Sequence, residues 1–203
     1  MNSDQQKLTV ILKKRIAIFA SGSGSNAQKI MEYFKRSPDA EVVLILTNNP
    51  QAYVLQRADN FEIPSHIFTK QEFYDTDEVI RILKTLQVDL IVLAGFLWLV
   101  PSSLLNAFPN KIINLHPALL PKYGGKGMYG DNVHKAILAA GEEESGITIH
   151  FVNTEFDEGE IIHQSRFKIE PGDNLEMVKF KVQQLEHQHF PKVIENLLKK
   201  MRS

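Results

Sequence analysis

The chain has 203 residues, 43% of them hydrophobic, and its 23 Lys and Arg residues nearly balance its 24 Asp and Glu residues, for a net charge of −1. This length and composition fit one globular domain with a full core and exclude a disordered or collagen-like chain. A balanced charge provides no global attraction to nucleic acid or to an anionic membrane. Cysteine is absent, which excludes thiol nucleophiles, disulfides and zinc–thiolate sites and suits a cytoplasmic location.

The N-terminal segment MNSDQQKLTVILKK holds one short apolar run bracketed by charged residues. This run is too short for a secretory signal or a membrane span. We therefore interpret residues 1–14 as a leader and expect residues 15–203 to form a single domain.

Strand and helix patterns alternate along the rest of the chain. In chain order they predict strand 15–20, helix 26–36, strand 41–47, helix 52–60, a short extended piece at 65–69, helix 75–86, strand 88–96, helix 101–108 and strand 111–116. After Pro121 they predict helix 134–140, two strands spaced as a hairpin at 145–153 and 160–169, and a long amphipathic helix at 175–200. The expected fold is α/β: an open, mostly parallel, twisted sheet of about seven strands with a C-terminal antiparallel extension and a long final helix.

In sheets of this kind, ligands bind beyond the carboxyl ends of the strands, where the strand order reverses. Four predicted loops meet this rule, at residues 21–26, 96–101, 114–127 and 153–159. We expect them to converge on one cleft.

The first of these loops is SGSGSN, between the first strand and its helix. Small residues let the backbone approach a phosphate, and free N–H groups with the helix dipole attract it, so Gly24, Ser25 and Asn26 are the expected contacts. A dinucleotide site would need an acidic residue where the sequence has Thr47-Asn48-Asn49, and the lysine of a triphosphate loop is also missing. The pattern favours a sugar-phosphate monoester, and a plain helix cap through Ser25 or Asn26 is the alternative.

Asn114 and His116 interrupt an apolar strand that runs into a loop rich in Pro and Gly. Residues i and i+2 of a strand share a face, so the two side chains can hold one atom together. An amide donor beside a His that can carry a proton is what an oxyanion formed from a carbonyl requires. A structural buried His is the alternative, and the position at the strand's carboxyl end favours catalysis.

The acidic turn NTEFDEGEII, residues 153–162, carries several carboxylates. Asp157 is the one expected to turn inward, because it is flanked by Phe156 and followed by Gly159. Beside His116 it would stabilise the protonated imidazole and could receive a proton through water. A solvated turn is the alternative.

Together, SGSGSN, LAGFLWLV, INLHPALLPKYGG, the Asp157 turn and VQQLEH resemble the glycinamide ribonucleotide formyltransferases, folate-dependent enzymes of purine biosynthesis. The likeness extends from about Arg15 to Leu198. Its Asn-x-His-Pro segment is shared by enzymes that use the formyl group of 10-formyltetrahydrofolate, whereas the Gly/Ser loop and Gln-x-x-Glu-His point to the glycinamide substrate. The resemblance implies a Rossmann-like formyltransferase fold, with a phosphate-binding half at about 15–110 and a catalytic and folate-binding half at about 111–203.

By this resemblance, the catalytic residues are Asn114, His116 and Asp157. The substrate-binding residues are Gly24, Ser25, Asn26, Gln183 and Glu186, the last two on one helix face. The folate-binding residues are Leu97, Trp98, Leu99, Val100, Asn114, Asn153, Thr154, Glu155, Phe156 and Asp157, although Trp98 fits a core position equally well. We expect glycinamide ribonucleotide and 10-formyltetrahydrofolate as ligands, no metal, no nucleic acid or membrane partner, and a cytoplasmic monomer or homodimer.

Several positions depart from the family pattern. Gln71 and Trp98 stand where relatives often have basic residues, Glu158 where they often have Gly, and the loop after PKYGG is longer than usual.

Three other functions remain open at this level. A formyltetrahydrofolate deformylase would use water in place of the amine, but it usually carries an extra N-terminal domain for which residues 1–14 leave no room. A methionyl-tRNA formyltransferase would need a C-terminal RNA-binding domain and a basic surface. A phosphosugar-binding protein could retain the phosphate loop without the chemistry.

Overall fold

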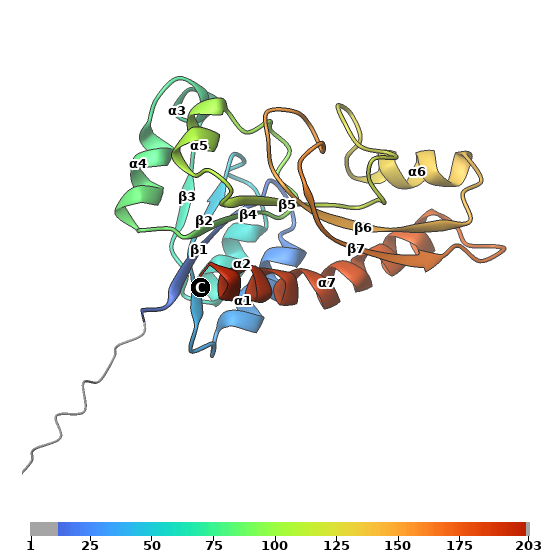
Figure 1. The fold of residues 1–203 in the computed structure, drawn as a ribbon, viewed down its shortest axis with the longest axis horizontal. Helices are drawn as coiled ribbons and strands as arrows, with labels where there is room; N and C mark the ends of the chain where they lie inside the picture. The colour runs from blue at the N-terminus through green and yellow to red at the C-terminus, as the bar shows by residue number, and fades with distance from the viewer. Residues whose placement is uncertain (1–11, 202–203) are drawn as a thin grey trace, which may run out of the picture.

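A computed structural model describes residues 12–201 (Figure 1). Its elements are β1 (Lys14–Phe19), α1 (Ser25–Phe34), β2 (Ala40–Thr47), α2 (Val54–Asn60), β3 (Ser65–Ile67), α3 (Lys70–Tyr74), α4 (Glu78–Thr85), β4 (Leu90–Leu93), α5 (Ser102–Ala107), β5 (Ile112–His116), α6 (Asp131–Ala139), β6 (Glu144–Phe151), β7 (Ile161–Lys168) and α7 (Leu175–Lys200). The predicted leader falls mostly outside the described residues, and its last residue, Lys14, belongs to β1.

The seven strands form one sheet in the order β3-β2-β1-β4-β5-β6-β7. The strands from β3 to β5 are parallel to their neighbours, and β6 and β7 continue the sheet antiparallel. This arrangement confirms the predicted mostly parallel sheet with an antiparallel extension. The chain builds outward from β1 to β3 and then returns to β4 on the other side of β1. The strand order therefore reverses between β1 and β4, where a ligand cleft is expected.

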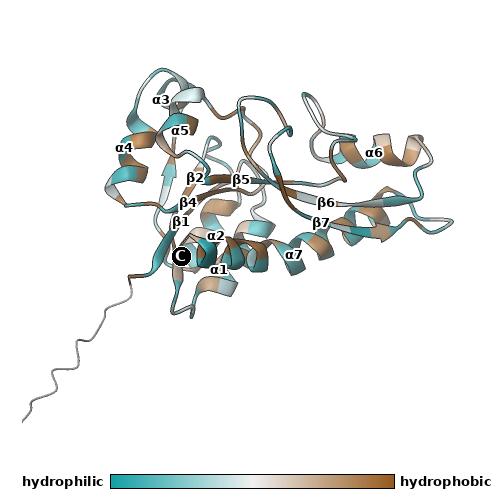
Figure 2. Cartoon of the chain, in the orientation of Figure 1, coloured by the Kyte–Doolittle hydropathy of each residue, from teal (hydrophilic) through white to brown (hydrophobic). Residues whose placement is uncertain are grey.

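Helices cover both faces of the parallel strands, and alternate strand residues supply the two cores. Ile16 and Ile18 of β1 pack in the core beneath α1, α2 and α7. Ala17 and Phe19 pack in the opposite core beneath α3, α4 and α5. Hydrophobic residues accordingly concentrate on the central strands and on one side of the covering helices (Figure 2). Strands covered on both faces explain the unbroken apolar runs in the sequence.

Several predicted boundaries differ from the structure, three of them by three residues. The predicted helix 75–86 begins only at Glu78, and a separate helix, α3, precedes it. Thr69 starts α3 through a capping box in which its hydroxyl accepts from the Glu72 N–H and the Glu72 carboxylate accepts from the Thr69 N–H. Helix α6 begins at Asp131, three residues before the predicted start, after Gly130. Strand β4 ends at Leu93 rather than at residue 96.

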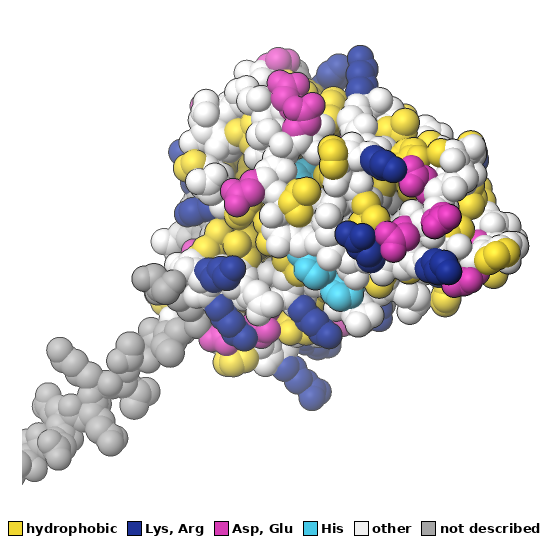
Figure 3. Space-filling view, turned by 45° about the vertical axis from the view of Figure 1, so that its right-hand side comes forward, with side chains coloured by type: hydrophobic (Ala, Val, Ile, Leu, Met, Phe, Trp, Pro, Cys, Tyr) yellow, Lys and Arg dark blue, Asp and Glu magenta, His cyan; other side chains and the backbone are white. Residues whose placement is uncertain are grey.

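Within residues 12–201 the structure contains no helix that combines the length and the apolar character needed to cross a lipid bilayer. On the face of the molecule shown in Figure 3, acidic and basic side chains are interspersed. This mixed surface agrees with the near-neutral charge of the whole chain.

Candidate active site

A cavity of about 480 Å³ opens beyond the carboxyl ends of β4 and β5. All four loops that were expected to converge contribute to it, through Asn26, residues 96–100, residues 114–117 with 125–127, and residues 155–157. Its volume lies within the range of about 300–1,000 Å³ that is usual for small-molecule sites. The predicted convergence is therefore confirmed.

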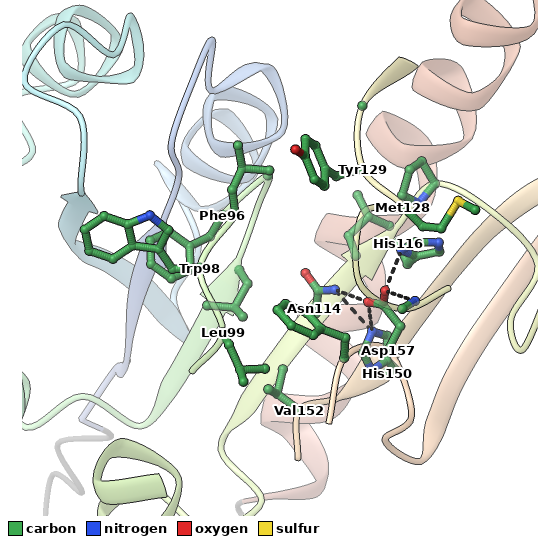
Figure 4. A pocket seen from close by; sticks show the side chains of 18 of the residues that line it. Phe96, Trp98, Leu99, Asn114, His116, Met128, Tyr129, His150, Val152 and Asp157 are labelled. Carbon is green, nitrogen blue, oxygen red and sulfur yellow. Dashed lines mark hydrogen bonds and ion pairs between the residues drawn. The ribbon is translucent and has the colours of Figure 1, made fainter. Parts of the chain in front are cut away.

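Asn114 and His116 lie at the carboxyl end of β5, and their side chains point toward Asp157 from the cavity wall (Figure 4). His116 is 3% exposed. Its Nε2 lies 2.7 Å from the carbonyl oxygen of Tyr123, and because a carbonyl only accepts, Nε2 donates in this bond. Its Nδ1 lies 3.4 Å from Asp157 Oδ2. The imidazole is thus held at both nitrogens, between the Tyr123 carbonyl and the Asp157 carboxylate.

Asp157 is the point at which three segments of the chain meet. Its Oδ2 accepts a hydrogen bond of 3.0 Å from the Gly125 N–H, and its Oδ1 accepts one of 3.3 Å from Asn114 Nδ2. Burial by itself would raise the pKa of this carboxyl group, but its contacts with His116, His150 and the Gly125 N–H outweigh burial and hold the pKa well below its ordinary value. Asp157 is therefore an inward-facing carboxylate at neutral pH, as the sequence predicted.

The turn that carries Asp157 depends on a close backbone approach. A Cβ atom added to Gly159 would lie 1.7 Å from the carbonyl oxygen of Phe151. Asp157 itself adopts φ of 59°, a conformation uncommon for a residue with a side chain. Only glycine fits at position 159, and the turn can fold back over β6 for that reason.

His150 belongs to the same cluster and was not predicted. It lies opposite Asn114 in the antiparallel pairing of β5 with β6. Its Nε2 lies 3.2 Å from Asn114 Nδ2 and 3.6 Å from Asp157 Oδ1, while its Nδ1 donates to the Phe151 carbonyl over 2.8 Å. The sequence signal was a histidine near the end of the strand that precedes the acidic turn. Its meaning depends on the register with β5, which the sequence pattern does not give.

The SGSGSN loop packs closely against α2. Gly24 has φ of 70°, and an added Cβ would lie 2.5 Å from Val54 Cγ2. The loop is held further by the Ser21 hydroxyl, which accepts from the Leu97 N–H over 3.2 Å, and by the Ser23 carbonyl, which accepts from Arg57 Nε over 2.7 Å. The backbone conformation of this loop is therefore fixed before any ligand binds.

Helix α7 reaches the same loop through Glu186. Asn26 Nδ2 donates to Glu186 Oε2 over 2.8 Å, and Asn26 Oδ1 is buried without a hydrogen-bond partner among residues 12–201. Burial raises the pKa of Glu186 to about 7, although the Asn26 bond and the nearby His116 act against this rise. The loop and α7 thus form a continuous polar wall beside His116.

Comparison with known proteins decides the family. Residues 14–194 match the family described as Formyl transferase. The phosphoribosylglycinamide formyltransferase of Bacillus subtilis is 38% identical over 190 residues, covering 91% of this chain and 95% of that protein. This chain belongs to the formyl transferase family.

Further relatives agree with this assignment. The chloroplastic phosphoribosylglycinamide formyltransferase of Arabidopsis thaliana is 41% identical over 188 residues, covering 90% of this chain; the matched part spans only 64% of the plant protein. The crystal structure of phosphoribosylglycinamide formyltransferase from Bacillus halodurans has a TM-score of 0.82 at 38% identity, covering 93% of this chain and 97% of that one.

Most residues predicted to form the site of this formyl transferase lie on the cavity wall: Asn26, Leu97, Trp98, Leu99, Val100, Asn114, His116, Glu155, Phe156, Asp157 and Glu186. Gln183 lines an adjacent cavity of about 460 Å³. Gly24, Ser25, Asn153 and Thr154 line neither cavity. Lining residues that the sequence did not suggest are Phe96, Met128, Tyr129, His134, His150 and Val152.

Trp98 lies at the boundary between the cavity and the core. It lines the cavity, and its ring lies about 6 Å from those of Phe68, Phe73 and Tyr74 in an aromatic cluster. Gln71 is exposed on α3 and does not line the cavity. Among residues 12–201 there is no group of three or more side chains suited to hold a metal ion.

Replacement of Gly24 by Ala is expected to lower the free energy of unfolding by about 1–3 kcal/mol, because Ala disfavours the positive φ and its methyl group meets Val54. Urea denaturation measures the change. Gly22→Ala is the matched control, since an added Cβ at Gly22 has no neighbour within 4 Å, and it should alter stability by less than about 0.5 kcal/mol. Equal effects of the two substitutions would contradict the proposed packing of the loop.

Asp157→Asn is expected to destabilise the protein in a pH-dependent manner. Because the pKa of Asp157 is lower in the folded state than its ordinary value of 3.8, its ionised form stabilises the fold above pH 3.8. This contribution is lost as the pH falls through the lower, folded-state pKa. The difference in unfolding free energy between wild type and variant should therefore be largest at neutral pH and shrink below pH 3.8. Asp59→Asn, at an exposed position on α2, is the control; a constant difference for Asp157→Asn would contradict the prediction.

Proposed function

We propose that this chain transfers the formyl group of 10-formyltetrahydrofolate to the amine of N1-(5-phosphoribosyl)glycinamide, a step of de novo purine (IMP) biosynthesis. One observation carries the proposal: Asn114, His116 and Asp157 are in contact on a cavity wall that continues to the phosphate loop through Asn26 and Glu186. Relatives that match most of this chain bear the name phosphoribosylglycinamide formyltransferase, which supports the same conclusion.

The two ligands would bind on different sides of the catalytic residues. Gly24, Ser25 and Asn26 would hold the substrate phosphate through backbone N–H groups at the start of α1. Gln183 and Glu186 would accept hydrogen bonds from the ribose hydroxyls, which places the amine near His116. The folate would lie between apolar side chains such as Leu99 and Val152, with backbone groups of residues 153–157 available to the pterin.

The residues present fit formyl transfer to an amine. When bound, 10-formyltetrahydrofolate supplies the formyl carbon that the neutral amine attacks. Asn114 and His116 would stabilise the negative charge that develops on the formyl oxygen. In the structure Asn114 Nδ2 lies within hydrogen-bond distance of His150 and Asp157, and His116 Nε2 donates to the Tyr123 carbonyl. Substrate binding must therefore replace at least one of these bonds by a bond to the formyl oxygen.

Asp157 would hold the His116 imidazole in position and help to carry away the proton that the amine loses. It is ionised at neutral pH and lies 3.4 Å from His116 Nδ1. A carboxylate with a low pKa is a weak base on its own, so the proton would leave the amine through the imidazole or through water. When the bond between the formyl carbon and N10 of the folate breaks, N10 would take up a proton by the same route, which leaves tetrahydrofolate as the second product. We expect the enzyme to act in the cytoplasm as a monomer or homodimer.

A formyltetrahydrofolate deformylase and a non-catalytic phosphosugar-binding protein are the competing functions. A deformylase needs no site for a phosphorylated amine, whereas here a closely packed Gly/Ser loop, which would suit a phosphate, contacts Glu186 on the cavity wall. A binding protein needs no cluster in which Asp157 contacts both Asn114 and the buried His116. Both features favour the transferase.

Incubation of the purified protein with 10-formyltetrahydrofolate, with and without glycinamide ribonucleotide, separates the three functions. The proposal predicts loss of the formyl group only when the amine substrate is present, with formylglycinamide ribonucleotide as product. Loss without the amine substrate indicates a deformylase. Binding of the ribonucleotide without turnover indicates a binding protein.

His116→Ala is expected to reduce kcat by about 100- to 1,000-fold, because it removes one donor that stabilises the developing charge. The dissociation constants of both ligands should change little, since their binding groups remain. His66→Ala, on β3 at the far edge of the sheet, is the control and should retain full activity. Full activity of His116→Ala would exclude His116 from the mechanism.

A further inference from the structure

His134 is a buried polar residue without a hydrogen-bond partner. It lies on α6, is 6% exposed, and is flanked by the apolar cluster of Ala118, Val133 and Ile137. Its Nδ1 is fully buried and unpaired, and neither ring nitrogen forms a hydrogen bond within residues 12–201. An unpaired buried polar group costs about 1–3 kcal/mol. An apolar side chain would fill the same space without this cost. Other histidines also have an unpaired buried nitrogen, such as His163, but His134 is the one of these two that lines a cavity.

The position of His134 suggests a function for the imidazole. The two adjacent cavities share part of their lining, namely Gly130, His134 and Glu186. The first cavity contains the catalytic cluster and the apolar folate walls, and the second contains Gln183 and Lys179 of α7. A ligand that extends from α7 toward His116 must pass this shared boundary, whereas a ligand confined to the apolar walls of the first cavity need not.

The surroundings keep the imidazole neutral. Burial lowers the pKa of His134. Asp131 opposes this effect, whereas Lys179 and His116 lower the pKa of His134 further. Glu186 faces the same boundary from α7. A neutral imidazole has one N–H donor and one acceptor nitrogen, which complements the N–H and C=O of a secondary amide. The bond between ribose and glycine in the proposed substrate is such an amide.

We propose that His134 contacts the ribosyl glycinamide at its amide linkage and so positions the amine between Glu186 and His116. The inference rests on the proposed function and assigns His134 to the glycinamide substrate rather than to the folate. Lys179 of the second cavity is already paired with Asp131 and Glu176, so it does not compete as a contact for an uncharged amide.

Two variants test the assignment. His134→Leu fills a similar volume without polar atoms, and His134→Gln retains a donor and an acceptor. Steady-state kinetics gives KM for each substrate, calorimetry gives the affinity for glycinamide ribonucleotide alone, and thermal unfolding is followed with and without that ligand. His163→Leu, a β7 residue outside both cavities, is the matched control.

For His134→Leu we expect KM and Kd for glycinamide ribonucleotide to rise about tenfold, because the loss of one hydrogen bond changes affinity by about this factor. KM for 10-formyltetrahydrofolate should change less than twofold. The free protein should be at least as heat-stable as wild type, because an unpaired polar group has been removed, while stabilisation by the ribonucleotide should decrease. His134→Gln should recover part of the affinity.

Other outcomes overturn the inference in distinguishable ways. If the wild-type protein neither binds nor formylates glycinamide ribonucleotide, the proposed function fails and the inference fails with it. If the wild type is active and His134→Leu retains its affinity for the ribonucleotide, only the assignment of His134 is wrong. If both KM values rise together and the free protein loses heat stability, His134 has a purely structural role.

Discussion

A buried carboxylate connects the parts of the molecule on which catalysis would depend. Asp157 contacts Asn114 and His116 on β5 and the Gly125 N–H in the following loop, and it lies close to His150 on β6. These contacts outweigh the cost of burial, which is why the carboxyl group remains ionised. The same contacts fix the orientations of the amide and the imidazole. The geometry of the site therefore depends on three chain segments that meet at one side chain.

The parallel sheet provides the frame for this cluster. Because the strand order reverses beside β1, loops from β1, β4 and β5 open on the same edge of the sheet. The antiparallel strands β6 and β7 then carry the Asp157 turn back over that edge, and α7 brings Glu186 to the SGSGSN loop. A substrate that carries a phosphate at one end and an amine at the other can bind along this polar wall. His134 lies where such a substrate would cross between the two cavities.

Much of this was predictable because the signals are local. Unbroken apolar runs predicted the parallel strands, and Asn114 with His116 in such a run indicated a site at the strand's carboxyl end. Asp157 was distinguished from its acidic neighbours by Phe156 and Gly159. His150 and His134 were missed because their significance depends on long-range packing: one on the register of β6 against β5, the other on how α6 meets α7. Helix α3 was missed because a five-residue helix gives almost no periodic signal, although its capping box was present in the sequence.

The central claim is that His116 and Asp157 act as one unit in formyl transfer. A double-mutant cycle measures this directly through kcat/KM for formylation of glycinamide ribonucleotide by His116→Ala, Asp157→Asn and the double variant. The proposed mechanism predicts that the double variant loses little more activity than the more damaging single variant, with a coupling energy above about 1 kcal/mol. Losses that add to within about 0.5 kcal/mol would show that the two residues act independently and would contradict the mechanism.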